Sequence, residues 1–101
     1  MSKSRLYIPE NSLALFCRKW KIEELSLFGS TLTDEFGPDS DVDVLIDFGG
    51  DADWSLYDWL EMKGELEALF GRRVDLVARE ELRNPFRRYA VLSSREVIYA
   101  S

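Results

Sequence analysis

The sequence predicts a small α/β domain of the α+β kind, in which a mixed β-sheet packs against helices. Short apolar runs rich in β-branched and large aliphatic residues, typical of buried strands, lie at residues 25–28, 42–48 and 74–77. Apolar residues at helical spacing precede the first run and separate the second from the third. Because a strand, helix, strand unit usually forms a parallel crossover, we expect the second and third strands to pair in parallel.

The predicted order is helix, strand, turn, strand, helix, strand, helix and short strand. The first helix begins near Pro9, the second ends at Gly71, and the third is a basic helix that Pro85 opens and that runs to about residue 93. A short strand is expected at residues 95–100. The apolar sides consist of Leu13, Phe16, Cys17 and Trp20 in the first helix, Trp59, Met62, Leu66, Leu69 and Phe70 in the second, and Phe86, Tyr89 and Ala90 in the third.

Composition indicates one compact domain over residues 1–101. A chain of 101 residues that is 46% hydrophobic fits one domain with one core. No apolar run is long enough to cross a bilayer, and residues 1–5 lack the apolar stretch of a signal peptide. We therefore expect a cytoplasmic protein with no membrane partner. The single Cys17 lies in an apolar helical stripe, which favours a buried thiol over a nucleophile or a metal ligand.

The chemistry-bearing motif is a Gly-Ser pair followed by two closely spaced aspartates. Gly29 and Ser30 come just after the first strand, and Asp41 and Asp43 lie at the start of the second. Side chains alternate along a strand, so the two carboxylates face the same way, about 6.5–7 Å apart, and can share divalent cations. The chain has no histidine. A metal site must then use oxygen ligands, which suit Mg²⁺ or Mn²⁺.

Each part of this motif also has a plain structural interpretation. An Asp-x-Asp pair is often solvated on an open sheet face, and Gly-Ser is a common turn. Asp75 in the third strand could by itself be an exposed residue of an edge strand. The conjunction of the strand-ending Gly-Ser pair, the gap, the paired aspartates and Asp75 favours the functional interpretation.

The chain resembles the minimal nucleotidyltransferases of the DNA polymerase β superfamily. The resemblance rests on residues 27–30, the gap closing at 38–40, residues 41–46 and residues 71–77. It implies a polymerase β-like nucleotidyltransferase fold in which the Gly-Ser turn binds the phosphates of ATP and three carboxylates hold two Mg²⁺ ions. The residues that would fill these roles are Gly29 and Ser30 for the nucleotide and Asp41, Asp43 and Asp75 for metal and catalysis.

The length and the C-terminal segment resemble the antitoxins encoded beside HEPN-domain ribonuclease toxins. That resemblance implies transfer of AMP from ATP to a tyrosine of the toxin, which silences it. Two alternatives stay open: an inactive nucleotidyltransferase fold that neutralises a toxin by binding, and a nucleotidyltransferase acting on a small molecule. The net charge of −6 argues against broad direct contact with nucleic acid.

Two features leave questions for the structure. Many relatives have an arginine directly after the serine, where this chain has Thr31, and the basic residues that could replace it are Lys21, Lys63, Arg72 and Arg73. Trp54 and Tyr57 lie on the polar side of the second helix, where aromatic residues indicate a docking surface. The alternative for Trp54, given equal weight, is that it precedes the helix and folds back over the core.

Overall fold

The computed structural model describes residues 6–37, 39–50 and 53–101. Two expectations concern residues outside these ranges, namely the lack of a signal peptide in residues 1–5 and the part of the motif gap at Pro38. The described chain forms the elements α1 (Glu10–Lys19), β1 (Glu24–Leu27), the 3₁₀ helix η1 (Gly29–Leu32), β2 (Val42–Asp47), α2 (Leu56–Phe70), β3 (Val74–Ala78), the 3₁₀ helix η2 (Arg79–Glu81), α3 (Pro85–Ser94) and β4 (Glu96–Ala100). The predicted order of helices and strands is confirmed.

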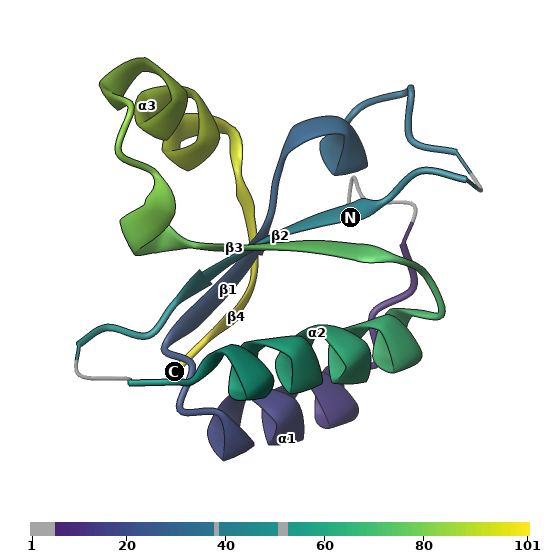
Figure 1. Ribbon diagram of the computed structural model, residues 1–101. Coiled ribbons are helices and arrows are strands. Elements are labelled where there is room, and N and C mark those ends of the chain that lie inside the picture. Colours follow the sequence, from purple (N-terminus) through teal and green to yellow (C-terminus); the bar gives the residue numbers. More distant parts are fainter. Residues whose placement is uncertain (1–5, 38, 51–52) are drawn as a thin grey trace.

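The four described strands form one mixed sheet in the order β3-β2-β1-β4 (Figure 1). β1 pairs antiparallel with both β2 and β4, whereas β2 and β3 run in parallel. The α2 helix connects the two parallel strands. It begins with a capping box between Ser55 and Asp58 and ends at Gly71, whose φ of 68° is left-handed. The predicted mixed sheet and the parallel crossover pair are therefore both present.

The main core lies between the sheet and the α1 and α2 helices, which cover the same face in Figure 1. The even-numbered residues of β2 point into it, and all of them are fully buried, because side chains alternate along a strand. Cys17 is also fully buried, and this burial raises the pKa of its thiol to about 12. The main core comprises Leu6, Leu13, Phe16, Cys17, Trp20, Ile22, Leu25, Leu27, Phe36, Val42, Val44, Ile46, Met62, Leu66, Phe70, Val74 and Leu76.

The α3 helix lies on the opposite side of the sheet from α1 and α2 (Figure 1). A smaller apolar cluster joins this helix to the sheet and consists of Phe28, Leu45, Leu82 and Val91. The prediction that Phe86 and Tyr89 form the buried side of α3 is wrong, because they are 85% and 76% exposed. Val91 is the buried residue of this helix, so the side that packs on the sheet is turned away from these two aromatic rings.

Trp54 belongs to the core side rather than to a docking surface. It precedes α2, and its ring packs edge-on against Trp20 at a centroid distance of 5.2 Å and near Phe48 at 6.4 Å. Tyr57, on the first turn of α2, is 84% exposed. The structure therefore supports the core alternative for Trp54. Within the described ranges, no helix combines the length and the hydrophobicity needed to cross a membrane.

Candidate functional site

The Gly-Ser turn lies directly against the beginning of β2. Gly29 has a φ of 64°, a conformation that favours glycine, and a Cβ atom added to it would lie 2.6 Å from Asp43 Oδ2 and displace that carboxylate. The Ser30 hydroxyl donates a hydrogen bond to the same Asp43 oxygen over 3.4 Å. Residues 29 and 30 therefore lie beside Asp43, one of the aspartates in the same sequence motif.

Thr31 holds this turn against the backbone of β2, a role that the sequence did not predict. Its side chain is almost fully buried, and its hydroxyl oxygen accepts a hydrogen bond of 2.8 Å from the Asp43 backbone N–H. The Asp43 carbonyl in turn accepts one of 3.1 Å from Phe28 N–H. Thr31, which stands where the family resemblance predicts an arginine, therefore anchors the turn to β2.

The predicted carboxylates gather on the sheet face opposite α1 and α2. Asp43 of β2 is in register with Asp75 of β3, and Asp41 directly precedes β2. Partial burial raises the pKa of Asp43, the charges of Asp75 and Asp41 raise it further, and the hydrogen bonds from Ser30 oppose the shift. The structure therefore brings Gly29, Ser30, Asp43 and Asp75 together and leaves negative charge concentrated among them.

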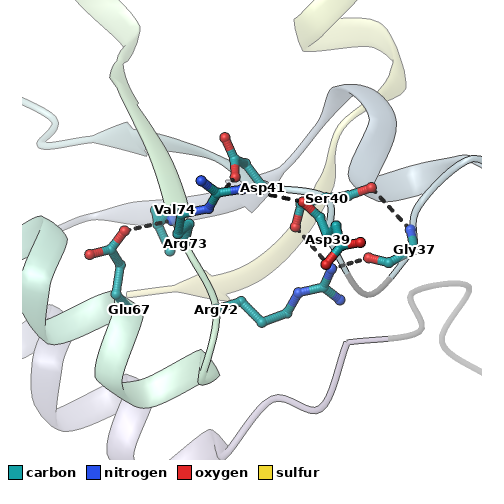
Figure 2. Close-up of polar contacts among 8 residues, drawn as sticks. All are labelled: Gly37, Asp39, Ser40, Asp41, Glu67, Arg72, Arg73 and Val74. Atoms are coloured by element: carbon teal, nitrogen blue, oxygen red, sulfur yellow. Dashed lines mark hydrogen bonds and ion pairs between the residues drawn. The ribbon is translucent and has the colours of Figure 1, made fainter.

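Asp41 lies at the margin of this group and pairs with a cation. Its carboxylate is 3.2 Å from Arg73 Nε, and both side chains are largely exposed, at 52% and 77% (Figure 2). Of the four basic residues considered as substitutes for the missing arginine, Arg73 is thus in contact with a predicted site carboxylate. An exposed ion pair of this kind contributes little to stability, so either group can exchange its partner for a ligand at low cost.

Arg72 holds the loop that delivers Asp41 (Figure 2). Its guanidinium donates to the carbonyl oxygens of Gly37 and of Ser40, the latter over 2.9 Å, and lies over the Phe36 ring at 4.1 Å from the centroid. The acceptors are backbone atoms, which any residue could supply. Nothing in the sequence pattern distinguishes Arg72 for this role, and only the folded chain shows it.

The donor set fits a hard divalent cation by its chemistry. All candidate ligands are carboxylate oxygens, the donors that Mg²⁺ prefers, and Asp43 lies beside Asp75 in a partly exposed position. As arranged here, no group of three or more acidic, cysteine or histidine side chains in the described part of the chain is gathered closely enough to hold an ion. Binding by all three aspartates therefore requires their side chains to move closer together, and the exposure of Asp41 permits such a movement.

Comparison with known proteins decides the family. A sequence profile of the nucleotidyltransferase domain matches residues 10–98. This chain belongs to the nucleotidyltransferase domain family. Its sequence is 38% identical over 81 residues to the protein adenylyltransferase MntA of Thermococcus cleftensis, which covers 80% of this chain and 77% of that relative. The nucleotidyltransferase resemblance read from the motifs is thus confirmed, and the chain is a homologue of a protein adenylyltransferase.

Solved structures of the family share the fold. A toxin–antitoxin complex with AMP-PNP contains a chain that superimposes with a TM-score of 0.71 at 19% identity, covering 93% of this chain and 75% of that one. A complex of an MNT antitoxin with a tri-AMPylated HEPN toxin of Shewanella oneidensis gives a TM-score of 0.60 at 21% identity, covering 91% and 70%. At these identities the likeness concerns the fold. The roles of individual residues remain predictions.

Proposed function

We propose that this chain is a Mg²⁺-dependent protein adenylyltransferase that transfers AMP from ATP to a tyrosine of a HEPN-domain ribonuclease toxin and acts as its antitoxin. The observation that carries the proposal is the contact of the Gly-Ser turn with Asp43, 3.4 Å from the Ser30 hydroxyl, beside Asp75 on one sheet face. Homology to the adenylyltransferase MntA and the AMPylated toxin in the Shewanella complex support it.

The turn and the carboxylates have different roles in the proposed nucleotidyl transfer. Asp41, Asp43 and Asp75 would hold Mg²⁺, which when bound stabilises charge on the attacking and leaving oxygens. The Ser30 hydroxyl, which faces Asp43 in this structure, can turn to a phosphate oxygen of ATP, and Gly29 lets that phosphate approach the backbone. The residues of the turn thereby hold the triphosphate so that its α-phosphorus faces the acceptor.

The bond changes follow from this placement. The acceptor hydroxyl oxygen forms a bond to the α-phosphorus, and the bond from that phosphorus to the bridging oxygen of the β-phosphate breaks. Pyrophosphate leaves with the electron pair, and the hydroxyl proton passes to the Asp75 carboxylate. Asp75 suits this role because it is exposed on β3, an edge strand of the described sheet, where a macromolecular acceptor can reach it. ATP and a ribonuclease toxin meet in the cytoplasm, so the proposal places the protein there.

Labelled ATP tests the proposal. The purified chain is incubated with α-³²P-ATP, Mg²⁺ and the HEPN-domain protein encoded beside it, and the products are separated by gel and by mass. We expect label on a tyrosine of the HEPN protein and release of pyrophosphate. Label on neither protein, despite a stable complex, would mean that the chain acts by binding alone, and label only on a small molecule would identify a different acceptor class.

Two variants test whether transfer of labelled AMP depends on the carboxylate site. Asp75→Ala is expected to slow the transfer step more than it weakens ATP binding, since this residue serves the acceptor hydroxyl. Asp47→Asn is the control, because Asp47 lies on the same strand face as Asp43 but is paired with Arg79 at 2.7 Å. Equal loss of transfer in both variants would contradict the assignment of Asp75.

A further inference from the structure

The α3 helix presents a surface that the proposed chemistry does not use. Phe86 and Tyr89, one turn apart, are 85% and 76% exposed, and Arg87 lies beside them on the outward side. Large aromatic side chains together with arginine are enriched where proteins bind one another. We call the outward side chains of Phe86, Arg87 and Tyr89, with the neighbouring Arg83, the α3 surface.

This surface is positively charged within an acidic protein. Residues 82–94 contain three arginines and no acidic residue, whereas the whole chain has a net charge of −6. Two other arginines nearby are engaged, Arg79 by Asp47 and Arg95 by Glu24. Across residues 6–37, 39–50 and 53–101, Arg83, Arg87 and Arg88 form no ion pair. Their charge is therefore available to an external group.

The α3 helix packs near the carboxylate site on the same face of the sheet. In the β2–β3 register, the Asp43–Asp75 pair is followed two residues later by the pair of Leu45 and Val77, about 6.5–7 Å farther along the strands. Leu45 and Val77 pack in the cluster that contains Val91 of α3. The helix thus stands on the same face of the sheet as the carboxylates, one row away. Because Asp75 is exposed on the edge strand β3, a protein that brings a side chain to it can extend over the neighbouring α3.

Resting on the proposed function, we propose that the α3 surface is the docking site for the protein acceptor, and that the acceptor meets it with an acidic surface bearing an apolar patch. The arginines contribute attraction and orientation, while Phe86 and Tyr89 become buried anchors. Beside them, a shallow hollow of about 440 Å³ lined by Pro85, Arg88, Tyr89, Leu92 and Ser93 can receive an apolar side chain of the acceptor.

Charge argues against the other occupants of this surface. A nucleic acid would place phosphates one row from Asp43 and Asp75, where negative charge is already concentrated. A second copy of this chain bound through the same surface about a two-fold axis would oppose arginines to arginines. An acceptor protein can confine its negative charge to the patch that faces the arginines, whereas a nucleic acid carries a phosphate on every nucleotide.

The test compares two triple variants with equal changes of charge and hydrophobicity. Phe86→Ser, Arg87→Glu and Tyr89→Ser alter the α3 surface. The control replaces Leu15→Ser, Arg18→Glu and Tyr57→Ser, exposed residues of α1 and α2 in the layer on the other side of the sheet. All six side chains are exposed, so both proteins should fold, which circular dichroism and thermal melting verify.

Calorimetry measures binding of each protein to the adjacently encoded HEPN-domain protein without ATP, and separately to ATP with Mg²⁺. We expect the α3 variant to bind the HEPN protein at least about tenfold more weakly, with an unchanged dissociation constant for ATP, and the control to match wild type. Unchanged binding by the α3 variant, equal loss in both variants, or no binding by wild type overturns the docking site.

Two further outcomes separate the alternatives. Wild type that binds the HEPN protein but transfers no AMP contradicts the proposed function, and the α3 variant still decides the docking site, because binding is measured without catalysis. A fluorescent single-stranded RNA is titrated in parallel. Tight RNA binding by wild type that the α3 variant loses, with HEPN binding retained, overturns the acceptor in favour of a nucleic acid.

Discussion

The same strands build both faces of the sheet, but the two faces have different roles. On the α1 and α2 face, Val42, Val44 and Ile46 are completely buried in a core of many side chains. On the other face, Asp41 and Asp43 lie partly or largely exposed, and the apolar cover is limited to a small cluster around Leu45. One strand, read at alternate residues, thus supplies both the stability of the fold and the candidate chemistry.

The difference shows how a small domain can maintain a charged site. On the carboxylate face the negative charges repel one another. Burial raises the pKa of Asp43, and the charges of Asp75 and Asp41 raise it further. The buried face, where burial of each large aliphatic side chain contributes on the order of 2 kcal/mol, offsets that repulsion. Substitutions at the carboxylate site should therefore change activity with little effect on stability, and those in the buried core should do the reverse.

The largest effect is expected for Asp43→Asn. Loss of this proposed metal ligand should lower kcat/KM for AMP transfer at least about a thousandfold, which corresponds to several kcal/mol of transition-state stabilisation. The fold should be no less stable, because its neighbours oppose the ionisation of this carboxylate. Transfer rates and thermal melting are measured together. Activity within a few-fold of wild type would remove Asp43 from the site.

Leu66→Ala should show the reverse pattern on the buried face. Leu66 of α2 is fully buried in the main core, so the cavity left by the substitution should lower the free energy of unfolding by about 3 kcal/mol. Urea denaturation measures this loss. The kcat/KM of the folded fraction should stay within about twofold of wild type, and a selective loss of transfer at full stability would show that the faces are not separable.

Asp47→Asn tests a carboxylate of the outer face that serves structure. Burial favours a higher pKa for Asp47, but the Gly49 backbone N–H and the Arg79 guanidinium outweigh it and lower the pKa below its usual 3.8. The ionised form therefore stabilises the fold above about pH 4, and that contribution fades as the pH falls through the lowered pKa.

At neutral pH the Asp47→Asn variant should lose about 1.5 kcal/mol of unfolding free energy, the usual contribution of a charge-assisted hydrogen bond. Denaturation curves at pH 7 and at successively lower pH measure the difference, which should shrink as the solution becomes more acidic. A difference that grows toward low pH would show that the sign of the pKa shift is wrong.

The smallest effect is expected for Ser30→Ala. In the proposed function the hydroxyl is one phosphate donor among the groups of the turn, so the dissociation constant for ATP should rise about three- to tenfold, or roughly 1 kcal/mol, with a smaller change in kcat. Calorimetry and steady-state rates separate the two quantities. A loss of kcat without a change in ATP binding would assign Ser30 to the transfer step.

Local patterns were enough to predict much of the fold and the members of the site. The strand at β2 was predicted from its alternating residues, the end of α2 from Gly71, and the chemistry from the Gly29-Ser30 pair and the three aspartates. Each of these signals depends on neighbours in the chain: strand alternation, a left-handed glycine, a turn that tolerates no side chain. The nucleotidyltransferase family followed from the same residues.

Tertiary structure decided which surfaces pack and which polar groups meet. Arg72 reaches carbonyl groups that lie more than thirty residues earlier in the chain. Every residue has a backbone carbonyl, so the sequence does not indicate which ones will accept these hydrogen bonds. The side of α3 that packs on the sheet, and with it the exposure of Phe86 and Tyr89, depends on how the helix docks rather than on its own periodicity. Local sequence was enough to predict the elements and to single out the candidate site residues, because both depend on short patterns. Their mutual placement depends on long-range packing, which no short pattern encodes.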